Sequence, residues 1–183
     1  MIRLVIFDHS GVLVNDLEIT WRAISRILDH YGKKADTLEE FRKKIKHPYW
    51  NYFVEKGLSL EDAKSKTIPE MYTDLYTEWI DQIALFDDVK NIILSLKEMS
   101  IKMAIVSQLP RKLIDGVIKR HDLMSYFDPI LGLHDYEEPK PSPSSLQKAL
   151  RLSGMDPANA IYVGDMQEDI IAAKRAGVLP VGI

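Results

Sequence analysis

The 183-residue sequence has no cysteine, which excludes disulfides, cysteine-based zinc sites and a thiol nucleophile. It also has no marked excess of charge of one sign, because 24 lysines and arginines stand against 27 aspartates and glutamates. Proteins that bind nucleic acids usually carry a basic stripe, so we expect no nucleic-acid partner. No apolar run approaches the roughly 18 residues of a transmembrane helix, and the apolar run at the N-terminus is too short for a signal peptide. We therefore expect a cytoplasmic protein that has no membrane partner.

Apolar residues make up 46% of the chain and charged residues 28%, as in an average globular protein. Short apolar runs toward the two ends of the chain are typical of strands that are buried on both faces. They span residues 2–7, 101–106 and 160–163, with weaker candidates at 130–133 and 178–183. Helical periodicity separates these runs, and Gly177 is suited to end the last helix. The alternation predicts an α/β fold, with a Rossmann-like parallel sheet and helices on both of its faces.

The segment after the first strand interrupts this alternation with helical patterns alone. Apolar residues recur there at helical spacing, as in Leu17, Trp21, Ile24, Leu28 and Tyr31. Asn15 or Asp16 is placed to cap the first of these helices. We predict a core domain of residues 1–14 and 85–183, with an all-helical domain of residues 15–84 inserted into it.

Polar residues that suit catalysis follow the predicted strands. Ligands of an open parallel sheet bind beyond the carboxyl ends of its strands, so these residues are expected to converge. They are Asp8 after the first strand, Ser107 and Gln108 after the second, Lys140 in a loop before a helix, and Asp165 and Asp169 after the strand at 160–163. Each one alone is common as a helix cap, a turn residue or a solvated side chain, and only the set points to a site.

The expected cluster has a consistent chemistry. Several carboxylates around one point repel one another and resist ionisation. A divalent cation relieves that conflict, and Mg²⁺ is commonly held by one or two carboxylates, water and substrate phosphate. A lysine and a hydroxyl beside the cation would complete a site for phosphate oxygens. Asp8 is then a metal ligand, a nucleophile or both.

Four segments resemble the motifs of the haloacid dehalogenase-like (HAD) hydrolases, and they occur in the family's order. The segment DHSGVL at residues 8–13 is similar to the first motif, D-x-D-G-[TV]-L. Ser107 matches the second motif, and Lys140, within K-P-x-P, matches the third. The segment GDMQED at residues 164–169 is similar to the fourth motif, G-D-x-x-x-D. The match spans almost the whole chain, and the inserted helices resemble the helical cap of the family's phosphatase-like branch.

The resemblance implies a catalytic group of Asp8, Ser10 and Lys140. Asp8 would attack phosphorus and form an aspartyl-phosphate, while Lys140, Ser107 and Gln108 would bind the phosphoryl oxygens. The cap would close over a small phosphorylated substrate and exclude water. We expect a monomer or a homodimer.

The same resemblance implies that Mg²⁺ is held by Asp8, the backbone carbonyl of Ser10, Asp165 and Asp169. Ser10 is also the main departure from the family, because most of its phosphatases have an aspartate there as the general acid and base. A serine hydroxyl does not fill that role at neutral pH without a base of its own, and losing such help typically costs about 10²–10⁴ in rate. The backbone carbonyl is unaffected, so the metal site is expected to survive.

Three functions follow from these residues, and Ser10 is what separates them. We favour a Mg²⁺-dependent phosphatase that acts on a small phosphorylated metabolite, with turnover slowed by Ser10. A second hypothesis is a related hydrolase of a phosphonate or halide bond, although family members of those kinds typically have tyrosine or alanine at this position. The third is a phosphate-binding or regulatory protein that has lost turnover.

Other residues are possible substitutes for the missing group. His47 in the inserted segment is one candidate, while His9 and His134 are weaker ones. A lysine for Schiff-base chemistry would come from Lys43, Lys44 and Lys46, although such a cluster is usually a solvated face. The aromatic residues of the insertion are expected to fill its core, with Tyr49 and Trp50 as candidates to face a ligand.

Overall fold

The computed structural model describes residues 1–45 and 49–183. The candidates Lys46 and His47 lie outside the described residues. The chain forms two compact units, one of residues 1–15 and 84–183 and one of residues 16–83. We call them the α/β unit and the helical unit, and each is described by itself.

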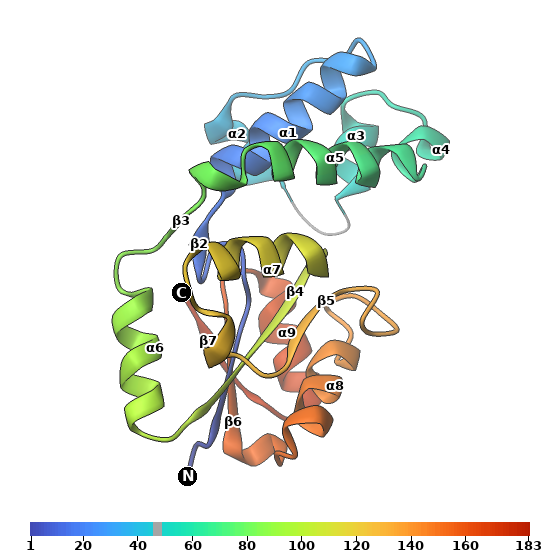
Figure 1. The fold of residues 1–183 in the computed structure, drawn as a ribbon. Coiled ribbons are helices and arrows are strands. Elements are labelled where there is room, and N and C mark those ends of the chain that lie inside the picture. Colours follow the sequence, from blue (N-terminus) through green and yellow to red (C-terminus); the bar gives the residue numbers. More distant parts are fainter. Residues whose placement is uncertain (46–48) are drawn as a thin grey trace. The chain divides into compact units, whose positions relative to one another are not determined.

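A parallel five-stranded sheet forms the centre of the α/β unit, with the strand order β5-β4-β1-β6-β7 (Figure 1). Its strands are β1 (Leu4–Phe7), β4 (Lys102–Pro110), β5 (Ile130–Leu133), β6 (Ala160–Gly164) and β7 (Leu179–Gly182). From β1 the chain builds the sheet through β4 to β5, and it then crosses to the other side of β1 to add β6 and β7. The strand order therefore reverses next to β1, which is where doubly wound sheets open a crevice for ligands.

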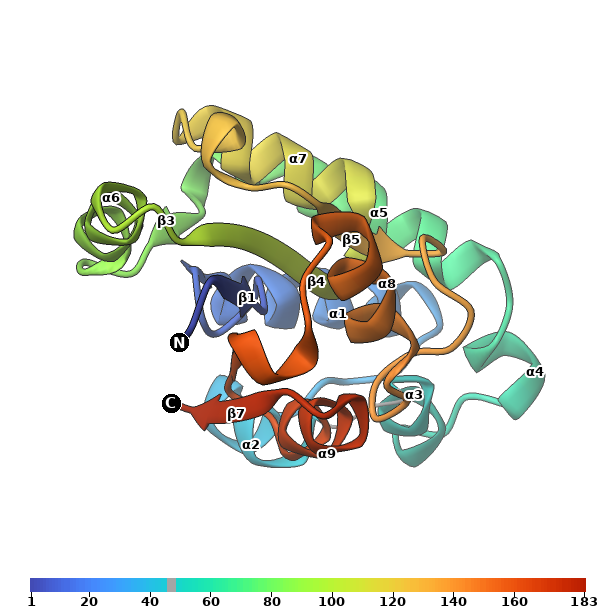
Figure 2. The same ribbon diagram turned by 90° about the horizontal axis from the view of Figure 1, so that it is seen from below.

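Helices cover both faces of this sheet (Figure 2). They are α6 (Val89–Glu98), α7 (Arg111–Arg120), α8 (Ser144–Ser153) and α9 (Gln167–Ala176), with short 3₁₀ turns at Met124–Tyr126 and Pro157–Asn159. Leu4 and Ile6 of β1 pack with Leu146 of α8 and Ala173 of α9 in one buried cluster. On the alternate positions, Phe7 makes an edge-on contact with Phe127, with ring centroids 6.2 Å apart. Both faces of β1 are thus apolar, which explains the unbroken apolar run in its sequence.

The predicted α/β fold is confirmed, and every predicted strand is present within a few residues of its expected bounds. Gly177 ends α9 in the left-handed conformation, with φ of 74°, as expected. Two strands were not predicted: β2 (Val14–Asn15) pairs with β3 (Ala84–Leu85) in a two-stranded antiparallel sheet. Two residues per strand are too few to produce an alternating pattern, so the sequence carries no signal for it.

The helical unit consists of helices and one 3₁₀ turn among its described residues. They are α1 (Leu17–His30), α2 (Leu38–Lys44), α3 (Trp50–Glu55), α4 (Leu60–Ala63), α5 (Thr67–Glu78) and the turn Ile80–Gln82. Phe41, Tyr52 and Phe53 are buried in its core, while Tyr49 and Trp50 pack against that core from partly exposed positions. The predicted cap residue of α1 is corrected in part. Asp16 occupies the capping position but makes no capping bond, because its carboxylate accepts a hydrogen bond from the Tyr76 hydroxyl at 2.7 Å.

Asp36 ties three helices of this unit together. Its backbone carbonyl accepts a hydrogen bond from Trp21 Nε1 of α1 at 2.9 Å. Its carboxylate accepts from Lys44 Nζ at 3.0 Å and from the Tyr52 hydroxyl at 3.2 Å, and it also forms an ion pair with Lys56. The hydrogen bond from Lys56 is the main reason that the pKa of Asp36 lies below its usual value.

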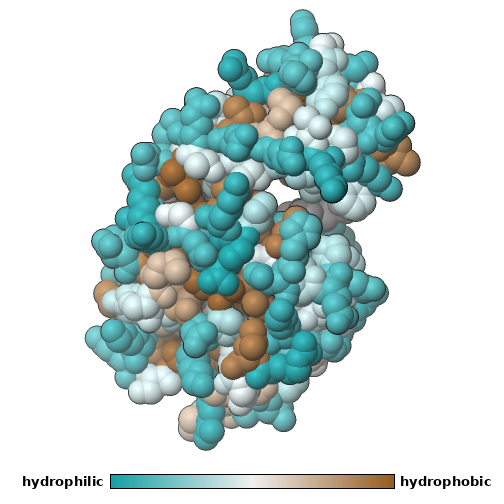
Figure 3. Space-filling view, turned by 45° about the vertical axis from the view of Figure 1, so that its right-hand side comes forward, coloured by the Kyte–Doolittle hydropathy of each residue, from teal (hydrophilic) through white to brown (hydrophobic). Residues whose placement is uncertain are grey.

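None of the described helices is long and apolar enough to cross a membrane. On the face of the protein shown in Figure 3, hydrophilic side chains dominate and apolar residues lie in small separate patches.

Replacing Asp36 with asparagine should lower the free energy of unfolding at pH 7 by on the order of 1 kcal/mol, because two ion pairs are lost. A carboxylate with a lowered pKa in the folded state stabilises the protein above its unfolded pKa of about 4, and this contribution disappears as the pH falls further. The deficit of Asp36→Asn should therefore shrink below about pH 4. Urea unfolding followed by tryptophan fluorescence measures it, because all three tryptophans lie in residues 16–83. Asp74→Asn on the exposed surface of α5 is the control, and a deficit that does not change with pH would contradict the assignment.

Candidate active site

Asp8 lies at the carboxyl end of β1, the central strand. Its backbone N–H donates to the carbonyl of Val163 at 2.9 Å, which continues the pairing of β1 with β6 by one residue. Its side chain is buried, and Oδ1 accepts a hydrogen bond from the backbone N–H of His9 at 2.7 Å. The Asp8 carboxylate is therefore fixed in direction by the chain that follows the strand.

The registers of the neighbouring strands bring the other predicted residues to the same edge. Phe7 pairs with Ile105 of β4, so Ser107 lies one residue beyond the position opposite Asp8. Phe7 also pairs with Val163 of β6, so Asp165 lies one residue beyond that position on the other side. Sequence-distant residues thus meet at the point where the strand order reverses.

Lys140 is buried in the centre of this group and bonds to three side chains. Its Nζ lies 3.0 Å from Asp8 Oδ2, 2.6 Å from Asp169 Oδ1 and 2.9 Å from the Tyr162 hydroxyl. An ammonium group has three N–H donors, so these contacts use all of them. The lysine accordingly forms two buried ion pairs that hold Asp8 and Asp169 in fixed positions.

Asp169 is bonded through both of its carboxylate oxygens. Oδ1 accepts from Lys140 and lies 3.1 Å from the Tyr162 hydroxyl, while Oδ2 accepts from the backbone N–H of Met166 at 3.0 Å. The last bond closes the N-terminal turn of α9, where a carboxylate also interacts favourably with the helix dipole. Asp169 therefore has a structural role at the start of α9 as well as its place in the cluster.

Two glycines leave room for the carboxylates. The Asp165 side chain occupies the space in which a Cβ of residue 11 would lie, and Gly11 has a left-handed φ of 75°. Likewise, the Asp169 side chain occupies the space in which a Cβ of residue 164 would lie. The chain can approach these acids so closely only because residues 11 and 164 have no side chain.

Burial shapes the charges of this cluster. It raises the pKa of the Asp8 carboxyl to about 7, against the lowering effect of Lys140. Burial also opposes the charge of Lys140, but Asp8, Tyr162 and Asp169 outweigh it and hold the pKa of the ammonium well above its usual 10.5. An ionised Asp8 thus depends on nearby positive charge.

The acidic residues of the cluster fit a metal ion. Asp8, Asp165 and Asp169 each offer a carboxylate oxygen, and these atoms lie within 4.8 Å of one another. Oxygen donors of this kind suit hard cations such as Mg²⁺. One lysine among three acids leaves an excess of negative charge, which a divalent cation would neutralise.

The remaining predicted residues lie around this cluster. Ser107 is buried, and its hydroxyl accepts a hydrogen bond from the backbone N–H of Leu109 at 3.2 Å. Gln108 and Ser10 are half-buried, and Ser10 forms a bridge with Val14 in the turn after β1. Gln108 makes no side-chain bond to the cluster among the described residues. His134, named as a weak candidate, is exposed.

Two tyrosines of the site were not predicted. Tyr162 is fully buried in β6 and contacts both Lys140 and Asp169, and the Tyr136 hydroxyl donates to the carbonyl of Ser107 at 2.8 Å. The sequence offers only a weak signal for Tyr162: a tyrosine in a strand buried on both faces needs a partner for its hydroxyl. It does not show which partner.

The lysine cluster of the helical unit is engaged in ion pairs where it is described. Lys43 Nζ lies 2.7 Å from Glu39, and Lys44 pairs with Asp36 and Glu55. These contacts favour a solvated, structural role for both lysines.

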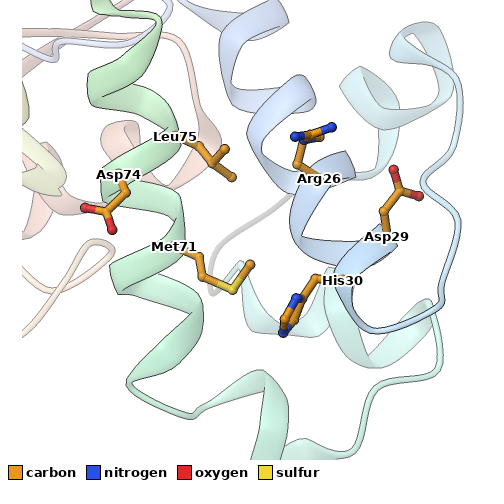
Figure 4. Close-up of a pocket in the computed structure, with 6 residues that line it drawn as sticks. All are labelled: Arg26, Asp29, His30, Met71, Asp74 and Leu75. Carbon is orange, nitrogen blue, oxygen red and sulfur yellow. The ribbon is translucent and has the colours of Figure 1, made fainter.

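A groove of about 500 Å³ lies between α1 and α5 in the helical unit (Figure 4). It is lined by Arg26, Asp29 and His30 of α1 and by Met71, Asp74 and Leu75 of α5. Its charged side chains are exposed and carry both signs, so they do not form a converging set like that around Asp8.

His9 is fully buried directly after Asp8, and neither of its ring nitrogens has a hydrogen-bond partner among the described residues. Leaving a buried polar group without a partner costs about 1–3 kcal/mol. His9→Leu should therefore raise the free energy of unfolding by about 1 kcal/mol, because leucine fills a similar volume without polar atoms. Scanning calorimetry measures the change, and His30→Leu on the exposed end of α1 is the control. A lower melting temperature for His9→Leu than for the control would show that the ring has a stabilising partner.

Comparison with known sequences identifies the family. A family model described as haloacid dehalogenase-like hydrolase matches residues 5–183. The chain belongs to this family. The predicted membership in the HAD hydrolases is thereby confirmed.

Relatives of this HAD hydrolase carry phosphatase names. It is 39% identical over 185 residues to a candidate pyrophosphatase, PpaX, of Caldanaerobacter subterraneus subsp. tengcongensis, covering 100% of this chain and 81% of the relative. It is 25% identical over 188 residues to a phosphoglycolate phosphatase of Pseudomonas putida, covering 99% of this chain and 69% of the relative. Among solved structures, a candidate phosphoglycolate phosphatase of Lactobacillus plantarum shares the fold, with a TM-score of 0.89 and 22% identity over 98% of this chain and 86% of that one.

Proposed function

We propose that this HAD hydrolase is a Mg²⁺-dependent phosphatase that acts on a small phosphorylated metabolite. The observation that carries the proposal is the buried contact of Lys140 with Asp8, in a cluster that also contains Asp165 and Asp169. The names of the relatives support the same class of reaction. In this proposal the protein acts in the cytoplasm, as a monomer or a homodimer.

Asp8 is the proposed nucleophile. One carboxylate oxygen forms a bond to phosphorus while the bond from phosphorus to the leaving oxygen breaks, and the electron pair stays with that oxygen. The product is an aspartyl-phosphate on Asp8. Water then attacks phosphorus, the bond to Asp8 breaks, and inorganic phosphate leaves with a proton released to solvent. Asp8 is restored as a carboxylate.

Lys140 orients the nucleophile and would provide positive charge for the phosphoryl oxygens. Its fixed position next to Asp8 requires little rearrangement during the reaction, which is the property that makes such charges effective. Ser107 and Gln108, at the carboxyl end of β4, would add hydrogen bonds to the same oxygens.

Mg²⁺ would be held by Asp8, the backbone carbonyl of Ser10, Asp165 and Asp169. When bound, it would neutralise negative charge shared by the nucleophile and the phosphoryl group. Both oxygens of Asp8 and of Asp169 already accept hydrogen bonds, so each carboxylate would bind the ion through a lone pair that these bonds leave free.

The helical unit is the proposed cap domain, which would select the substrate and exclude water. In this proposal the α/β unit carries the chemistry and residues 16–83 carry the specificity.

Wild-type protein should hydrolyse p-nitrophenyl phosphate only when Mg²⁺ is present, and Asp8→Asn should lower kcat/KM by at least about 10³, because the amide is not a nucleophile. Release of p-nitrophenolate measures the rate, with and without a chelator. Asp156→Asn, on the 3₁₀ turn before β6, is the matched control and should retain full activity, since Asp156 caps that turn away from the cluster.

Activity that survives in Asp8→Asn would exclude an aspartyl-phosphate on this residue. A wild-type protein that binds phosphate but hydrolyses no phosphate compound would instead favour the phosphate-binding function.

A further inference from the structure

Ser10 lies two residues after the nucleophile, at the position from which the family resemblance expects a general acid. It is half-buried in the turn after β1 and bridges to Val14. A serine hydroxyl is about as weak an acid as the alcohol that would leave, so it has little tendency to protonate that leaving oxygen. The leaving oxygen of a substrate would therefore not receive its proton from Ser10 in the way that a carboxylic acid provides it.

Three other donors near Asp8 in the α/β unit, those of Lys140, Tyr162 and Tyr136, are already engaged, and the ring of His9 is fully buried. All three N–H donors of Lys140 are directed at Asp8, Asp169 and Tyr162, and transferring one proton would leave two buried carboxylates without their counter-charge. The Tyr162 hydroxyl is buried behind Lys140 and lies 3.1 Å from Asp169. The Tyr136 hydroxyl donates to the carbonyl of Ser107. These bonds direct the protons of Lys140, Tyr162 and Tyr136 at groups of the protein itself.

The need for a general acid depends on the leaving oxygen. An alkoxide is nearly as basic as hydroxide, so an alcohol must be protonated as it leaves. A carboxylate, with a pKa of about 4, leaves as a stable anion, and so does a phosphate, whose second pKa is about 6. A site without a general acid thus loses far more rate on alkyl phosphates than on anhydrides.

We propose that this enzyme is selective for phosphoryl groups bound through an anhydride oxygen, as in phosphoanhydrides and acyl phosphates, over phosphate esters of alcohols. The inference rests on the proposed phosphatase function and names its substrate class. Asp8 attacks the terminal phosphorus, the P–O bond of the anhydride breaks, and the electron pair leaves on a phosphate or carboxylate oxygen that takes up no proton. Water hydrolyses the aspartyl-phosphate, and the step releases inorganic phosphate and a proton to solvent.

The test compares kcat/KM for substrates whose leaving oxygens differ in basicity. Substituted phenyl phosphates form a graded series, with glycerol phosphate as the alkyl phosphate and with pyrophosphate and acetyl phosphate as the two anhydride sources. Wild type should lose rate steeply as the leaving oxygen becomes more basic. Ser10→Asp should raise kcat/KM for glycerol phosphate by about 10²–10⁴ while changing that for acetyl phosphate by less than about 10-fold.

Ser10→Asn is the matched control, because it changes the size and polarity of residue 10 in a similar way without adding an acid. It should keep the steep dependence of wild type. The ratio of rates on pyrophosphate and acetyl phosphate shows which anhydride the protein prefers, and either preference agrees with the proposal.

A wild-type rate that is insensitive to the leaving oxygen would overturn the inference, because another group would then be supplying the proton. An equal gain on all substrates in Ser10→Asp would overturn it as well. Failure of the proposed function looks different: wild type and both variants, folded by circular dichroism, would hydrolyse none of these compounds.

Discussion

The site depends on the buried ion pairs that the ammonium group of Lys140 forms. This group lies between the carboxylates of Asp8 and Asp169, which come from opposite ends of the sequence, and it is almost completely removed from solvent. Breaking a buried ion pair by removing one partner typically costs about 3–5 kcal/mol, because the other charge is left unpaired. Lys140, Asp8 and Asp169 are therefore coupled in stability as well as in position. The same group joins β1, the loop before α8 and the first turn of α9.

The close packing around this cluster also explains the identity of neighbouring residues to which we assign no role in the reaction. Any side chain on residue 11 would collide with Asp165, and any side chain on residue 164 would collide with Asp169. The close approach of the backbone to these acids therefore requires glycine at both positions. Tyr162 satisfies the third donor of the ammonium from within the sheet. Tyr162 can thus be required because it completes the bonding of Lys140.

Much of the fold can be predicted from apolar runs in the sequence. The apolar run before Asp8 and the run at 160–163 predict buried parallel strands, and their carboxyl ends predict where Asp8 and Asp165 meet. The hydrogen bonds and ion pairs within the site are harder to predict from the sequence, because they depend on strand register and on how deeply each side chain is buried. Nothing in the sequence shows that Asp169 is bonded to Lys140 through one oxygen and to the Met166 N–H through the other. Asp16 shows the same limit, since a residue placed to cap α1 instead bonds to Tyr76, 60 positions away.

The small sheet of β2 and β3 has a consequence for how this protein can change. Val14 pairs with Leu85 and Asn15 with Ala84, so the chain leaves and re-enters the α/β unit through neighbouring, hydrogen-bonded strands. We call this two-stranded sheet the stem. The stem fixes the distance between the two ends of an insertion, whatever the length or fold of residues 16–83. An insertion whose ends are already side by side can be lengthened, shortened or exchanged without stretching the domain that carries it. The stem would thus allow recombination to exchange residues 16–83 while the α/β unit stays unchanged.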